Sequence, residues 1–328
     1  FVSYLVYAAA PNWYWCVAAM IIYYVGQGTS SHSCGTICGN CLQNCDRAKG
    51  MLICESLAAG LLGMVGPQLA VFALVKVIGA DEHAATAHDY HYLFYMSAAF
   101  TLISLVVVLT KLSNQKMVVK KESGSVVREG LELLKNNKNA RKWIVIGAIG
   151  MAPQAMILPY VQVYAGEVKM ASVAVLGTMV TVSALTSTLL GYFVGVIADR
   201  IGRKKVLYVI WPLYWLSIVL LMVAPSPAVL ILSGMLQGFY HISAPLAGAV
   251  QRELVDPSVM GTWLGVTRMT GNLFSALMAF LAGIIYDNLG PEIMFLIFIG
   301  MEAFIRLPLL VSIPETLHMK GEEEGCCD

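Results

Sequence analysis

The chain has 328 residues, of which 58% are hydrophobic and only 12% are charged, and its formal net charge is +1. Soluble domains carry about 25% charged residues, and the interior of a soluble domain of this length is too small to bury so much apolar surface. The composition therefore excludes an ordinary soluble domain and indicates a protein that lies in a membrane.

Apolar runs that are long enough to cross a bilayer predict spanning helices along most of the chain. In chain order these runs occupy residues 13–38, 51–78, 91–110, 143–165, 172–197, 206–223, 227–250, 262–286 and 292–313. The apolar segment 1–10 precedes them, and at 1.5 Å per residue it spans about 15 Å, which is half of a bilayer. We expect this segment to be the end of a truncated helix.

The positive charges lie mainly on one side of these helices. Alternation of the helices across the membrane places 17 of the 21 Lys and Arg residues on the same side. The segments on that side are 41–50, 111–142, 198–206, 251–261 and the tail 314–328. Cytoplasmic loops carry an excess of Lys and Arg. We therefore expect the linker and the C-terminus to lie in the cytoplasm, and the membrane to be the cell membrane.

The longest hydrophilic stretch, 111–142, divides the helices into two groups. The predicted fold class is an all-α polytopic membrane protein with a partial N-terminal bundle at 1–110, a cytoplasmic linker at 111–142, a six-helix C-terminal bundle at 143–313 and a tail at 314–328. Within the linker, the Val126–Leu134 portion either forms a short amphipathic helix on anionic lipid or belongs to a solvated basic segment.

The most informative motif lies between two of the predicted spans. It reads Gly195-x-x-x-Asp199-Arg200-x-Gly202-Arg203-Lys204, and it resembles the loop signature of the major facilitator superfamily of secondary transporters. Facilitators of this family have two bundles of six helices. The resemblance implies that the chain covers roughly helices three to twelve of such a carrier, with the first two helices missing.

Other elements of the sequence strengthen the resemblance. Gly63-x-x-Gly66-Pro67 resembles an element that antiporters of the family carry in their fifth helix, although the paired glycines expected next are absent. The segment 313–316 resembles a recurrent ending of the family after its last helix. The two halves also share an internal order. In the first half Gln27 is followed by a glycine 23 residues later, and in the second half Gln237 is followed by a glycine 24 residues later, within similar segments.

The basic loop is the first candidate site. In the family such a loop latches the cytoplasmic face of the two halves when the carrier faces outward. We expect Gly195 to let neighbouring helices approach closely, and Asp199 to accept backbone hydrogen bonds or to pair with Arg200 or Arg203. The remaining residues of this predicted latch are Gly202 and Lys204. Alternatively, the basic residues only anchor the helices at the inner surface.

The second candidate site is a polar cavity. The resemblance implies that helices one, four, seven and ten surround the transport path, so the polar residues of these helices are candidates for binding the substrate. They are Gln27, His32, Gln154, Tyr160, Gln237, Tyr240 and His241. The two histidines either titrate near neutral pH, and so bind substrate or carry protons, or bond to carbonyl groups in helix packing.

Charged residues within predicted spans are candidates by default, because burying a charge in a membrane costs much free energy. Glu55 and Arg268 lie about one turn from the cytoplasmic starts of their helices, and either one lines the inner cavity or holds the contact between the bundles. Arg268 alternatively extends to the inner interface. Glu302 and Arg306 are four residues apart in the last span, and we interpret them as a structural ion pair.

The cysteines are unusual, because Cys34, Cys38, Cys41 and Cys45 fall on one face of a continuous helix. A soft-metal or thiol-sensing site is one interpretation. We prefer the interpretation that these cysteines are small residues at a helix contact near a reducing cytoplasm. The sequence contains no phosphate-binding Gly-Lys-Ser/Thr loop and no recognisable catalytic motif, and it lacks the features of a nucleic-acid-binding domain.

We therefore expect a secondary active transporter that acts as a monomer, without a cofactor, and moves a small organic solute out of the cell in exchange for protons. The alternatives are uptake of a metabolite by symport or uniport, and a membrane sensor or scaffold that transports nothing.

Overall fold

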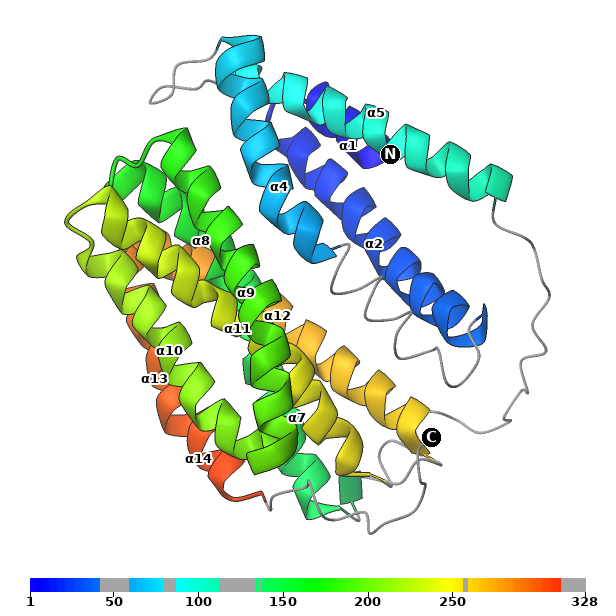
Figure 1. Ribbon diagram of the computed structural model, residues 1–328, viewed down its shortest axis with the longest axis vertical. Helices are drawn as coiled ribbons and strands as arrows, with labels where there is room; N and C mark the ends of the chain where they lie inside the picture. The colour runs from blue at the N-terminus through cyan, green and yellow to red at the C-terminus, as the bar shows by residue number, and fades with distance from the viewer. Residues whose placement is uncertain (42–58, 80–86, 112–133, 136, 256–258, 314–328) are drawn as a thin grey trace. The chain divides into compact units, whose positions relative to one another are not determined.

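The computed structural model describes residues 1–41, 59–79, 87–111, 134–135, 137–255 and 259–313 (Figure 1). The secondary structure of these residues is entirely helical, without a strand. Wherever the chain is described, each predicted span is helical apart from Ile157 and a few residues at the span ends. The predicted amphipathic helix at 126–134 lies outside the described residues, apart from Leu134.

The contacts of the chain group it into two compact units, Phe1–Lys120 with Ser172–Thr181, and Lys121–Ala171 with Val182–Asp328. The first unit contains α1 (Val2–Ala8), α2 (Trp13–Cys41), α4 (Ala59–Phe72), the π-helix η2 (Ala73–Ile78) and α5 (Ala87–Lys111). In it α1 packs against both α2 and α5. The hydroxyl of Ser3 donates to the carbonyl of Ala19 at 3.0 Å, and the rings of Tyr7 and Phe94 stack.

The second unit contains the longer series of helices. These are α7 (Lys138–Met156), α8 (Leu158–Val163), η3 (Tyr164–Val168), α9 (Val173–Ile201), α10 (Arg203–Val223), α11 (Pro227–Glu253), α12 (Met260–Leu289), α13 (Pro291–Met301), η5 (Glu302–Arg306) and α14 (Leu307–Val311). The start of α9 belongs to the first unit.

Two of the predicted helices are irregular in the structure. The helix predicted at 143–165 is divided at Ile157 between α7 and α8, with Pro153 inside α7 and Pro159 in the first turn of α8. A proline removes a backbone donor and disturbs the preceding turn. The helix predicted at 292–313 contains the π-helical segment Glu302–Arg306, a distortion that is frequent at functional sites.

Seven of the described helices are long and apolar enough to cross a membrane. They span His88–Thr110, Lys138–Val168, Val173–Ala198, Arg203–Val223, Pro227–Glu253, Met260–Leu289 and Pro291–Val311. Many of their large apolar side chains are exposed, among them Leu109, Phe280 and Phe304. Hydrocarbon is the solvent that such surfaces require, and the chain is therefore a multi-pass membrane protein.

The core of the second unit is built on two helix pairs, α10 with α11 and α7 with α12. Trp143, Leu207, Trp211 and Trp263 are fully buried in it. The hydroxyl of Ser233 on α11 donates to the carbonyl of Ser217 on α10 at 2.7 Å. Small residues and interhelical hydrogen bonds of this kind hold helices together in membranes.

A glycine brings α11 close to α9. A Cβ atom added to Gly238 would lie 2.6 Å from the carbonyl oxygen of Ser183 and 2.7 Å from the Cβ of Thr186. Real atoms do not approach so closely, and one of the two neighbours is a backbone atom. By contrast, no described atom lies within 4 Å of the position that a Cβ of Gly195 or Gly66 would take. The close approach expected at Gly195 is therefore not found among the described residues.

We predict that Gly238→Ala lowers the free energy of unfolding by about 1–3 kcal/mol, because the added methyl group pushes α11 away from α9. Thermal unfolding of the purified protein in detergent measures the change. Gly248→Ala on the same helix is the matched control, because its added methyl group meets no described atom within 4 Å. It should leave stability unchanged or raise it by up to about 1 kcal/mol. Equal effects of the two substitutions would refute the packing role of Gly238.

Candidate functional site

The residues predicted as a basic loop lie at the junction of two helices, which are joined by a single residue. Helix α9 continues to Ile201 and α10 begins at Arg203. Gly202 between them has a φ of +111°, a conformation that glycine adopts readily and other residues avoid. The expectation that the helix ends at residue 197 is therefore wrong, and Asp199 lies in the last turn of α9, although its side chain is outside the described residues.

Arg203 forms an ion pair with Glu253 at the end of α11. Both side chains are about one fifth exposed, at 23% and 22%. The sequence motif offers Asp199 as a partner for Arg203 and does not point to Glu253. One signal could have revealed it. An acidic residue in the last turn of a helix is opposed by the helix dipole, so such a residue is expected to have a cationic partner.

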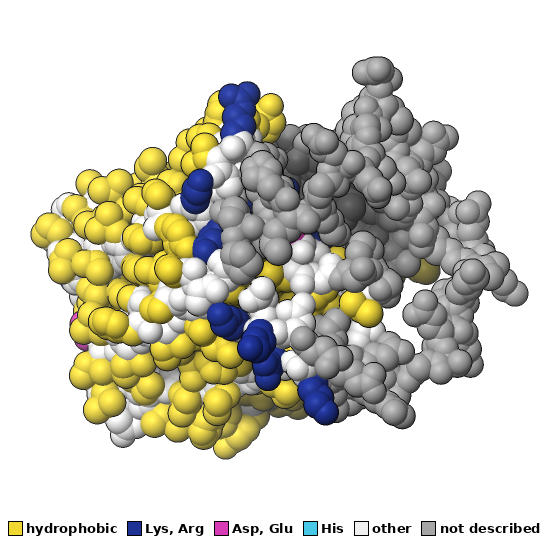
Figure 2. All heavy atoms as spheres, turned by 90° about the horizontal axis from the view of Figure 1, so that it is seen from below, with side chains coloured by type: hydrophobic (Ala, Val, Ile, Leu, Met, Phe, Trp, Pro, Cys, Tyr) yellow, Lys and Arg dark blue, Asp and Glu magenta, His cyan; other side chains and the backbone are white. Residues whose placement is uncertain are grey.

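Lys204 ties the start of α10 to the end of the last helix. Its ammonium group donates to the carbonyl oxygen of Val311 at 3.0 Å and to that of Ile313. Lys142 at the start of α7 donates to the neighbouring carbonyl of Ser312 at 3.2 Å. Lysines near a helix C-terminus satisfy the last carbonyl groups and complement the dipole. Seen from below, this end carries a band of Lys and Arg side chains beside apolar surface (Figure 2).

The cavity candidates of the second unit lie in different surroundings. On α11, Gln237 is buried and Tyr240 is half-buried one turn further along the helix, whereas His241 is exposed. The amide nitrogen of Gln237 has no hydrogen-bond partner among the described residues. On α7 and α8, Gln154 is exposed and Tyr160 is half-buried. Thus Gln237 and Tyr240 share one side of α11, while no described contact joins them to the candidates of α7 and α8.

Tyr160 instead lies against the end of α12. Its ring is 4.9 Å from the ring of Tyr286, centroid to centroid. Arg268, the candidate charge of α12, is exposed. The predicted role of Arg268 in the inner cavity stays a prediction.

The candidates in the first unit are described only in part. Gln27 is exposed on α2, and the side chain of His32 on the same helix lies outside the described residues. Glu55 and Cys45 are outside them entirely, as are the side chains of Cys34, Cys38 and Cys41. In α4, Pro67 lies inside the helix and Gly63 and Gly66 precede it. No group of three or more His, Cys, Asp or Glu side chains that could hold a metal occurs in the described part of the chain.

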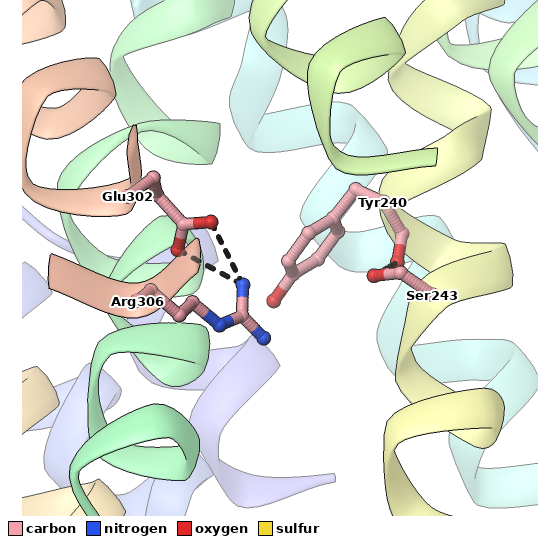
Figure 3. A network of polar contacts seen from close by, with 4 residues as sticks. All are labelled: Tyr240, Ser243, Glu302 and Arg306. Carbon is pink, nitrogen blue, oxygen red and sulfur yellow. Dashed lines mark hydrogen bonds and ion pairs between the residues drawn. The ribbon is translucent and has the colours of Figure 1, made fainter. Parts of the chain in front are cut away.

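The second unit also buries a charged pair in its interior (Figure 3). One terminal nitrogen of Arg306 lies 2.9 Å from each carboxylate oxygen of Glu302. Only 1% of Glu302 and 6% of Arg306 is exposed. The predicted ion pair is therefore confirmed. The sequence had not indicated its surroundings, which include Trp211, Tyr214 and Tyr240.

Comparison with known proteins agrees with this architecture. The family model of the Major Facilitator Superfamily matches residues 151–324, which is more than half of the chain. A search of the curated proteins finds no match. The matched region contains the end of α7 and all helices from α8 to α14. The family match and the apolar helices together show that the chain belongs to the major facilitator superfamily, a family of multi-pass membrane transporters.

Proposed function

We infer that this protein is a secondary active transporter that moves a small organic solute by alternating access. The observation that carries the inference is the family match over α8–α14, a region that contains the basic loop and its ion pair. The positive charge of that loop supports a cytoplasmic location. The protein then acts as a monomer in the cell membrane, with the 111–142 linker and the C-terminus inside.

The direction of transport that we propose is efflux in exchange for protons. The support is the Gly63-x-x-Gly66-Pro67 segment of α4, which resembles the corresponding element of family antiporters. In the structure this proline lies within a helix that continues into the π-helical segment η2. Such distortions of a spanning helix are frequent where transporters bind or change shape.

Transport can be tested in cells that express the protein, with ethidium as a probe for efflux and mass spectrometry of cell extracts for other solutes. Proton-linked efflux lowers the accumulation of a solute, and a protonophore abolishes the difference from control cells. Symport instead raises accumulation in a protonophore-sensitive way, and uniport is insensitive to the protonophore. If no solute changes in any condition, the protein is a sensor or scaffold and the proposal is wrong.

We predict that Asp199→Asn slows turnover without abolishing the binding of the substrate, because the latch needs the charge of this residue and the cavity does not. Initial transport rates and substrate binding to purified protein provide the two measurements. A mutant that transports at the wild-type rate would rule out a latch role for Asp199.

We predict that Arg203 and Glu253 stabilise the protein together by about 1 kcal/mol, a small value because both side chains are partly exposed. A double-mutant cycle with Arg203→Gln and Glu253→Gln, followed by thermal unfolding, measures this coupling. Lys205→Gln is the control, since this lysine is exposed. Strictly additive effects of the two substitutions would show that the ion pair contributes no stability.

A further inference from the structure

The buried pair in the second unit uses only part of Arg306. Both hydrogen bonds to Glu302 come from the same terminal nitrogen, Nη1. A guanidinium group has five N–H donors, and its usual contact with a carboxylate is a fork of two parallel bonds from two nitrogens. Here the Nε atom is buried and has no hydrogen-bond partner among the described residues. The edge formed by Nε and Nη2 is thus available to a second acceptor.

The guanidinium group is held rigidly in place. Its central carbon lies 3.8 Å from the centroid of the Trp211 ring, a stacking contact that favours a cation. On α7, Gly150 leaves room for the group, because a Cβ atom at this position would lie 2.3 Å from Nη2. A glycine, an aromatic ring and a carboxylate therefore fix the orientation of Arg306 before any ligand arrives, which is the arrangement that a binding site requires.

Other polar groups of the same interior lack partners. Among the described residues, unpaired buried atoms include the indole nitrogen of Trp211, the hydroxyl of Tyr214 and the amide nitrogen of Gln237, whereas the indole of Trp215 faces the carboxylate of Glu302. Apart from the hydroxyl, which can also accept, each is only a donor. Buried polar groups are nearly always hydrogen-bonded, and an excess of donors indicates that an acceptor is missing from the cluster.

Tyr240 connects this interior with the surface of the unit. Its ring centroid lies 5.2 Å from that of Tyr214, and its hydroxyl points toward the guanidinium group of Arg306 (Figure 3). Tyr240 is half-buried, whereas Tyr214, Trp211 and Arg306 are buried. A ligand that reaches Tyr240 from the surface therefore meets Arg306 behind it.

We propose that Arg306, Tyr214 and Tyr240 form a binding site for a carboxylate group, held by the free edge of the guanidinium and by the two hydroxyls. Glu302 orients Arg306 and balances its charge in the absence of ligand. The inference rests on the proposed transport function, and it deepens that function by assigning a carboxylate to the solute.

Acetate is the probe for the site, and acetamide, of similar shape but neutral, is its control. Each is titrated into the purified protein while tryptophan fluorescence is recorded, because Trp211 contacts Arg306. The ionic strength is kept constant with the bulky buffer HEPES. We expect saturable binding of acetate and none of acetamide. Tyr240→Phe should weaken acetate binding about threefold through the loss of one hydrogen bond.

Replacing Arg306 alone would leave Glu302 buried without a partner and could prevent folding. The double variant Glu302→Gln/Arg306→Gln removes both charges together, and it should weaken acetate binding at least about tenfold. Glu302→Gln alone leaves Arg306 buried without a counter-ion, so its folding is checked first by circular dichroism and size-exclusion chromatography. The folded variant should bind acetate about tenfold more tightly, because the carboxylate that competes for the guanidinium is gone. If the ion pair is only structural, Glu302→Gln does not increase the affinity for acetate. If folded wild-type protein and folded Glu302→Gln both fail to bind acetate, water satisfies the donors and the proposal is wrong.

The binding measurement needs no transport, so it separates the two proposals. A protein that binds acetate but moves no solute retains the carboxylate site and refutes the transport function. Where transport is found, acetate is added to strongly buffered proteoliposomes. An increase in KM with unchanged kcat shows that the site holds the carboxylate of the solute. Unchanged kinetics despite acetate binding contradict that assignment and show that the site holds a free anion.

Discussion

The absence of hydrogen-bonding solvent in hydrocarbon is the constraint on which the rest of this structure depends. In lipid each backbone polar group must find its partner within the protein, so the spanning segments are helices. Glu302 and Arg306, both buried in the second unit, likewise pair with each other. At the water boundary, Lys204 and Lys142 bind the carbonyl groups with which the last helix ends. Each of these features supplies a partner for a polar group that would have none in lipid.

The same constraint changes what holds the helices together. Lipid is as apolar as leucine, so burying leucine against another helix gains little, and close packing becomes decisive. In the second unit Gly238 lets α11 approach α9 closely, and the hydroxyl of Ser233 on α11 donates a hydrogen bond to α10. The interior can therefore include tryptophans, tyrosines and an ion pair, provided that their shapes fit. The polar cluster around Arg306 occupies such an interior.

Sequence reasoning predicted the helices well because each spanning segment carries its own signal, an apolar run of the required length. It placed their ends less well. Helix α9 continues past residue 197 because it ends where Gly202 allows a positive φ, and not where the first charge occurs. Contacts between helices could not be predicted. Gly195 belongs to a recognisable family motif yet shows no close neighbour among the described residues, whereas Gly238, which belongs only to the internal repeat, does. Glu253 and the surroundings of Arg306 likewise become apparent only once separate helices are brought together.

The connection between α9 and α10 through Gly202 has a mechanical consequence. Consecutive Cα atoms are held about 3.8 Å apart, so these two helix ends cannot slide past each other or separate. Only rotation about the bonds of the junction can alter the angle between them. Since Lys204 in the first turn of α10 also holds the end of α14, displacement of the C-terminal end of α9 is passed directly to two further helices. At this junction the angle between the two helices can change, but the distance between their ends cannot.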